Sequence, residues 1–133
     1  NEKKQLVIDI AHEFGLKVLA IVLALTKTPE WTYMDQLEYG AKLFFEIAII
    51  KLADRMHNVS TVVLLTKDRD WQIQYLKETT DEVIPTLTAC VEFIPAQHKE
   101  QYEADLAQLN LDTEEALEQV LHQEEPASTA PSP

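Results

Sequence analysis

The sequence predicts an all-α fold, built as a bundle of several helices. Glycine occurs twice in 133 residues, whereas leucine, alanine, glutamate, glutamine and lysine are frequent. These frequent side chains lose little rotamer freedom in a helix, and adjacent β-branched residues, which favour strands, are few. Apolar residues also recur three and four positions apart along most of the chain, which is the spacing of one helix face.

Length and charge narrow the class of protein further. A chain of 133 residues with 46% hydrophobic content is long enough for one domain with its own core. Its formal charge of −12 repels phosphate backbones, so we expect no nucleic-acid partner. The longest mainly apolar stretch, residues 16–25, is about half the length of a membrane-spanning helix, so no membrane partner is expected. The single Cys90 and the lack of a recognisable secretory signal favour a cytoplasmic location.

In the first half of the chain, helical periodicity predicts helices over residues 2–14, 16–26, 30–46 and 47–65. Gly15 separates the first two, because glycine most readily adopts the left-handed conformation at a helix end. The 16–26 helix is apolar nearly all round, so we expect it to be buried. The segment 27–29 ends it, since Pro29 cannot continue a helix.

The second half begins with a polar connection over residues 66–70, in which Asp70 is a plausible N-cap for a helix starting at Trp71. Pro85 should kink or restart that helix, and Pro95 should end the stretch that follows. The side chains predicted to face inward are Ile73, Leu76, Thr80, Val83 and Ile84.

Residues 98–109 should form a further amphipathic helix, and Asp112 with Glu115 resembles a capping arrangement for a short last helix that ends near Gln123. Residues 124–133 lack apolar anchors and are rich in Glu, Pro, Ala, Ser and Thr, so we expect a disordered tail. The predicted organisation is one helical domain over 1–123 followed by this acidic, proline-containing tail.

The helix predicted over 47–65 carries an apolar stripe and a polar stripe on roughly opposite sides. The polar stripe consists of Lys51, Asp54, Arg55, Asn58 and Thr61. One interpretation is a solvated, salt-bridged face, which is the usual meaning of alternating charge on a helix. Against it, residues 47–52 are too apolar for a surface helix and Asn58 is a poor helix-interior residue, so the polar face is expected to line a site.

Residues 49–58, Ile-Ile-Lys-Leu-Ala-Asp-Arg-Met-His-Asn, resemble the KLADR-x-HN signature of the HD-superfamily phosphohydrolases, which include the RelA/SpoT-like alarmone hydrolases. Glu13-Phe14-Gly15 with Val18 and Leu25-Thr26-Lys27 resembles a stretch that follows the HD motif in that family. Lys77-Glu78-Thr79 with Pro85 and Leu87 resembles a later family helix. The three pieces occur in the family's order and span residues 7–87.

The resemblance implies a divalent metal, typically Mn²⁺, held by two histidines and two aspartates, and Asp54 matches the last of these ligands. Such an ion acidifies a water molecule for attack on phosphorus. Asn58 and Thr61 match positions that contact the nucleotide in the alarmone hydrolases. Lys51 and Arg55 match signature positions that offset the charge of Asp54 or orient an acidic group, and they are included as substrate-binding candidates.

The chain departs from the family pattern because no His-Asp pair precedes Glu13. We therefore expect the catalytic residues and three of the four metal ligands to lie upstream of Asn1, so that this chain is an N-terminally incomplete HD-domain bundle. His12 is interpreted as a surface residue, and His57 as pointing away from Asp54. His98 and His122 are expected to be solvated.

The resulting hypothesis is a metal-dependent phosphohydrolase of the small alarmone hydrolase type, with a nucleotide (pyro)phosphate as its small-molecule substrate and (p)ppGpp as the candidate. This chain alone would be incompetent. A catalytically inactive HD-type helical module with a binding or regulatory role is the alternative, and a purely structural acidic bundle is a third. The sequence leaves the substrate and the oligomeric state open.

Overall fold

The computed structural model of the chain describes residues 2–24, 26, 33–64 and 68–129, and these residues form helices and turns without a strand. The predicted all-α class is confirmed. Six α-helices occur among the described residues: α1 (Glu2–Ala24), α2 (Tyr33–Leu43), α3 (Glu46–Thr61), α4 (Arg69–Glu78), α5 (Ile84–Ala89) and α6 (Ala96–Thr129). Short 3-10 turns at Val62–Leu64 and Cys90–Phe93 and a π-helical turn at Thr79–Val83 complete the described elements.

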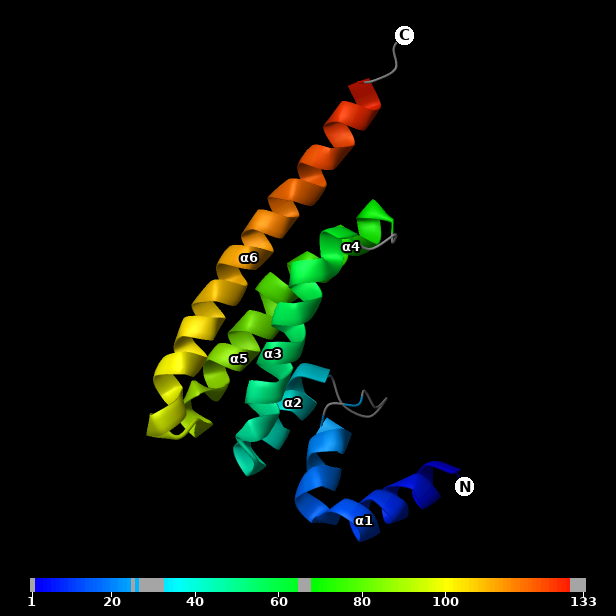
Figure 1. Cartoon of the computed structure of the whole chain (residues 1–133), viewed down its shortest axis with the longest axis vertical. Helices are drawn as coiled ribbons and strands as arrows, with labels where there is room; N and C mark the ends of the chain where they lie inside the picture. Colours follow the sequence, from blue (N-terminus) through cyan, green and yellow to red (C-terminus); the bar gives the residue numbers. More distant parts are fainter. Residues whose placement is uncertain (1, 25, 27–32, 65–67, 130–133) are drawn as a thin grey trace.

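Three rods form the body of the molecule (Figure 1). α3 runs in one direction, α4 and α5 return as one nearly continuous rod, and α6 runs back beside them. α2 packs against α3 and α5 at one end of the body, and α1 packs against α2 and α3. Among the described residues, no helix combines the length and the apolar character needed to cross a membrane.

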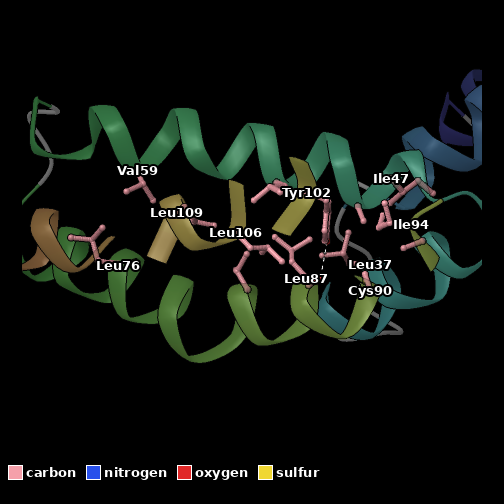
Figure 2. Close-up of a cluster of buried hydrophobic side chains, with 14 of the residues drawn as sticks. Leu37, Ile47, Val59, Leu76, Leu87, Cys90, Ile94, Tyr102, Leu106 and Leu109 are labelled. Carbon is pink, nitrogen blue, oxygen red and sulfur yellow. Dashed lines mark hydrogen bonds between the residues drawn. The ribbon is translucent and has the colours of Figure 1, made fainter. Parts of the chain in front are cut away.

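The core lies between these rods (Figure 2). Leu37, Ile47, Leu76, Leu87 and Leu109 come from five different helices and are fully buried. Tyr102 of α6 sends its hydroxyl across the core to donate a hydrogen bond of 2.7 Å to the Leu87 carbonyl, which satisfies the one polar atom of that side chain.

Cys90 lies in the same core, and burial raises the pKa of its thiol to about 11. Burial likewise raises the pKa of the Tyr102 phenol. Both groups therefore remain neutral at physiological pH, as an apolar core requires.

The first two predicted helices form α1, which breaks at Gly15 with φ 88° and ψ 169°. This conformation is open to glycine, so the predicted break is confirmed. The expectation that residues 16–26 are buried is wrong, because Leu16 is 75% exposed and Val18, Val22 and Leu23 are exposed as well. The reason is geometric: α1 contacts α2 and α3, and these exposed side chains lie on the part of its surface that those contacts leave uncovered.

α2 ends at Leu43, earlier than the predicted end of this helix at Glu46. Residues 30–32 at its predicted start and the predicted break over 27–29 lie outside the described residues. Phe44 and Phe45 turn the chain and pack against the core, and α3 begins at Glu46. Lys17 of α1 forms an ion pair of 2.6 Å with Glu46. This hydrogen bond from Lys17 holds the pKa of the Glu46 carboxyl below its ordinary value.

Asp68, not Asp70, is the N-cap of α4. Its carboxylate accepts a 2.8 Å hydrogen bond from the Trp71 backbone N–H, so the helix begins at Arg69, two residues earlier than predicted. Residues 65–67 of the predicted connection lie outside the described residues. The expected restart at Pro85 is confirmed, since α5 has this proline in its first turn directly after the π-helical turn.

α6 is one continuous helix, so the predicted boundary at Asp112 is wrong. Asp112 caps no helix there and instead accepts a 2.8 Å hydrogen bond from Gln108, four residues earlier on the same helix. Thr113 is buried and satisfies its hydroxyl by donating to the Leu109 carbonyl at 2.7 Å. The helix also continues past Gln123 to Thr129, through Pro126, and residues 130–133 of the predicted tail lie outside the described residues.

Candidate functional site

α3 carries every candidate site residue, and its packing decides how each is presented. Ala48, Leu52 and Val59 are buried on the side that faces the core. Successive residues are rotated by about 100° around a helix, so Arg55 lies close to this buried side and Asp54 about one step away from it. The polar stripe predicted from the sequence is therefore divided between the interior and the surface.

Arg55 belongs to the interior, at 4% exposure. Its Nη1 donates to the Thr79 Oγ1 at 3.0 Å, its Nη2 lies 3.4 Å from the Glu78 Oε1, and its guanidinium stands over the Tyr75 ring at 4.3 Å from the centroid. These three partners all come from the rod formed by α4, the π-helical turn and α5, which we call the α4 rod. The guanidinium, proposed from the sequence as a substrate contact, thus bridges α3 to α4 in this structure.

The π-helical turn supplies the Thr79 partner. The sequence predicted Thr80 as the inward residue, but Thr79 is fully buried and Thr80 is exposed. The Thr79 hydroxyl can be buried because it accepts from Arg55 and donates to the Tyr75 carbonyl at 2.9 Å. Sequence periodicity could not identify Thr79 as the buried residue. It can distinguish two adjacent threonines only by their positions on an ideal α-helix, and the π-helical turn departs from that geometry.

Asp54 belongs to the surface, with 54% of its side chain exposed. Its Oδ2 lies 3.5 Å from the Lys51 Nζ and 3.5 Å from the Asn58 Nδ2. The Lys51 side chain is 10% exposed, so its stem is buried while its ammonium reaches the carboxylate. Lys51, Asp54 and Asn58, which we call the Asp54 cluster, are the predicted residues that the structure brings together.

Thr61 completes the predicted stripe but is turned back on its own helix. Its hydroxyl lies 3.3 Å from the Asn58 carbonyl and 3.4 Å from the His57 carbonyl. It is half-buried and lies two turns along α3 from Asp54, on the same side.

The four histidines are exposed, as the sequence predicted for His12, His98 and His122. His12 and His57 are exposed on α1 and α3. His98 is exposed and stacks on Phe45 at a centroid distance of 5.8 Å, and His122 lies 3.7 Å from Glu118 on α6. Within residues 2–24, 26, 33–64 and 68–129, no three His, Cys, Asp or Glu side chains are grouped so as to hold a metal ion.

Comparisons with protein families, with characterised proteins and with solved structures find no significant match to this chain. The geometry of α3 is therefore the structural information that bears on function. It consists of one exposed carboxylate, one amide beside it, and two cationic side chains whose stems are packed into the body.

Proposed function

We propose that this chain is part of a metal-dependent phosphohydrolase of the HD type, in which Asp54 supplies one ligand to a divalent cation, Mn²⁺ by preference, and the substrate is a nucleotide (pyro)phosphate such as (p)ppGpp. The proposal rests on the sequence resemblance over residues 49–58. The observation that supports it is the presentation of Asp54: a carboxylate exposed to solvent on a helix that is held in the core through neighbouring residues such as Leu52 and Arg55.

The rigidity of that helix is what a metal site requires. Ligands must be held within a fraction of an ångström of their working positions, and residues on packed helices achieve this better than residues on loops. Arg55 fixes α3 to the α4 rod through Thr79, Glu78 and Tyr75, directly beside Asp54. Arg55 therefore serves as a positioning residue in this proposal, instead of contacting the substrate.

Asp54 fits a hard divalent cation as one oxygen ligand. A complete site needs further ligands, which the described residues do not supply. In the proposal these ligands and the catalytic groups belong to other parts of the parent protein, and no step of hydrolysis is assigned to this chain. Lys51 would pass from pairing with Asp54 to pairing with a substrate phosphate once a cation binds the carboxylate, since it lies at 3.5 Å from it.

Asn58 and Thr61 are the proposed substrate contacts. Asn58 has an amide that can both donate and accept, and it already lies within reach of Asp54. Its position one turn along α3 places it beside, not opposite, any group bound at the carboxylate.

The test uses the longest natural form of the protein. Bound manganese is measured by mass spectrometry, and pyrophosphate release from ppGpp is assayed on the same sample. Both signals should disappear in Asp54→Ala and persist in Asp70→Ala, which removes an exposed aspartate from α4. Unchanged far-UV circular dichroism in both variants shows that the fold is retained. Activity that survives Asp54→Ala would sink the proposal.

An inactive helical module is the second candidate, and one observation favours it: Asp54 is already paired with Lys51 and Asn58 within the chain. A carboxylate whose charge is offset in this way needs no cation. Under this reading the longest natural form binds no manganese and releases no pyrophosphate, and Asp54→Ala changes neither.

A further inference from the structure

A pocket of about 160 Å³ lies between α3 and the first turns of α6, away from the Asp54 cluster. Its residues come from two rows, each with the i, i+3, i+4, i+7 spacing of one helix face. The α3 row is Ile49, Leu52, Ala53 and Met56, and the α6 row is His98, Gln101, Tyr102 and Asp105.

The pocket exists because an apolar row faces a mostly polar row. Further along the same interface, Leu106 and Leu109 of α6 lie with Val59 of α3 in the core (Figure 2). Nearer the start of α6 the pocket residues His98, Gln101 and Asp105 are polar, and the Tyr102 hydroxyl donates to the Leu87 carbonyl. Opposite them Ala53 is small, and it leaves room between its neighbours Ile49 and Met56.

The two walls of the pocket differ in polarity, so each favours a different part of a bound molecule. The α3 wall is hydrocarbon and thioether, with Ile49 and Met56 half-buried, so it favours an apolar group and in particular a ring against the methionine sulfur. A cavity of roughly 150 Å³ is large enough for one benzene-sized ring. The α6 wall is mostly polar, so an occupant with a polar group on that side can form a hydrogen bond there that a wholly apolar occupant cannot form.

The α6 wall offers acceptors. Gln101 donates its amide N–H to the Asp105 Oδ1 at 2.9 Å, and both residues line the pocket. An ionised carboxylate has two oxygens and accepts several hydrogen bonds, so this bond leaves it able to accept from an occupant as well. The group facing it must therefore be a donor, and a cation is the strongest one because the chain carries a formal charge of −12.

We propose that this pocket binds a small arylalkylamine, in which a saturated carbon joins the amine to an aromatic ring, with its ring against Ile49, Ala53 and Met56 and its ammonium group directed at the Asp105 carboxylate. The proposal does not depend on the phosphohydrolase function, because the pocket residues lie about 100° or more around α3 from Asp54. It would add a second, independent ligand site to the same helix.

The two methionines make the test direct. The sequence contains Met34 and Met56 and no others, so a protein labelled with methyl-¹³C methionine gives two methyl signals. Met56 lines the pocket, whereas Met34 lies on α2 and serves as an internal control. Benzylamine is the probe, and benzyl alcohol and benzoate, which keep the ring but change the charge, are the comparisons.

The expected result is a saturable shift of the Met56 signal with benzylamine, at an unchanged Met34 signal. Benzyl alcohol should bind about three- to tenfold more weakly, because it lacks the ion pair with Asp105, which keeps part of its strength when half-exposed. Benzoate should not bind at concentrations at which benzylamine saturates the site. Asp105→Asn should remove the preference for benzylamine over benzyl alcohol while leaving the binding of benzyl alcohol unchanged.

Ala53→Leu fills the space and should abolish the shift with every probe, whereas Ala107→Leu, on the exposed side of α6, should leave it intact. The proposal is overturned if benzylamine moves the Met56 signal no more than the Met34 signal, or if benzoate binds as well as benzylamine. These two outcomes come from the unmodified chain, so they hold even if a variant fails to fold.

Discussion

α1 and α6 are the two longest helices among the described residues, and both are rich in apolar residues, yet α6 buries many of these side chains and α1 leaves many of them exposed. α6 buries Tyr102, Leu106, Leu109 and Val120 between the other rods of the body. α1 leaves Leu6, Ile8 and Leu16 at 50% exposure or more. Apolar composition therefore shows which side chains a helix could bury, whereas the neighbouring elements determine which of them are buried.

The two helices also differ in what holds them. α6 contacts α3, α4 and α5 along much of its length, so any single contact is supported by its neighbours. α1 is joined to the rest through α2 and α3, by contacts that include the Lys17 to Glu46 ion pair. Single substitutions should therefore destabilise the fold strongly in the body and weakly in α1, and four experiments test this difference.

The largest effect is expected for Leu109→Ala, because this leucine is fully buried and its removal leaves a cavity. The free energy of unfolding in urea should fall by about 2–5 kcal/mol. Leu111→Ala, two residues away and 59% exposed, and Leu16→Ala in α1, 75% exposed, should each change it by less than about 0.5 kcal/mol. A loss of several kcal/mol for Leu16→Ala would show that α1 is buried in solution and would end the contrast.

The next effect concerns the bridge between α3 and the π-helical turn. Thr79→Val keeps the shape but removes the acceptor for Arg55 Nη1, so a buried guanidinium loses one partner. Unfolding should require about 1–3 kcal/mol less. Thr80→Val is the matched control, because Thr80 is exposed and its hydroxyl is not needed by Arg55. Equal effects of the two substitutions would contradict the register of the π-helical turn.

The N-cap of α4 should have a smaller effect. Asp68→Ala leaves the Trp71 N–H without its carboxylate partner and should cost about 1 kcal/mol in thermal or urea unfolding. Asp70→Ala should have less effect, since Asp70 lies inside the first turn of the helix and caps nothing. If the order is reversed, the boundary predicted from the sequence is right and the structural one is wrong.

The smallest effect is expected where α1 meets α3. Lys17→Ala should reduce stability by about 0.2–1 kcal/mol, and less at high salt, because the ion pair is partly exposed. Its pH dependence has a definite sign. The pKa of Glu46 is lower in the folded chain than its ordinary value of 4.5, so the contribution is present above pH 4.5 and is lost as the pH falls through the folded pKa. Urea unfolding of the parent and of Lys17→Ala should therefore converge in acid.

Much of the architecture could be predicted from the chain alone. The break at Gly15, the restart at Pro85 and the end at Pro95 followed from residues whose backbone preferences are local. Errors arose where two local signals competed. Asp68 and Asp70 are both suitable N-cap residues, and the structure uses Asp68. Asp112 and Glu115 have the spacing of a capping box, but Leu109, Thr113 and Ala116 are buried in succession, so the helix continues through Asp112.

For the candidate site, the sequence was enough to predict which residues share a face of α3. Asp54, Asn58 and Thr61 lie along one side because helical spacing is a property of the backbone. The tertiary structure alone decided that Arg55 is drawn into the body by Thr79 and Glu78 while Asp54 stays outside. It also decided that α1 exposes its apolar residues. Burial and pairing depend on which elements meet, and those contacts join residues more than twenty positions apart, which no local pattern encodes.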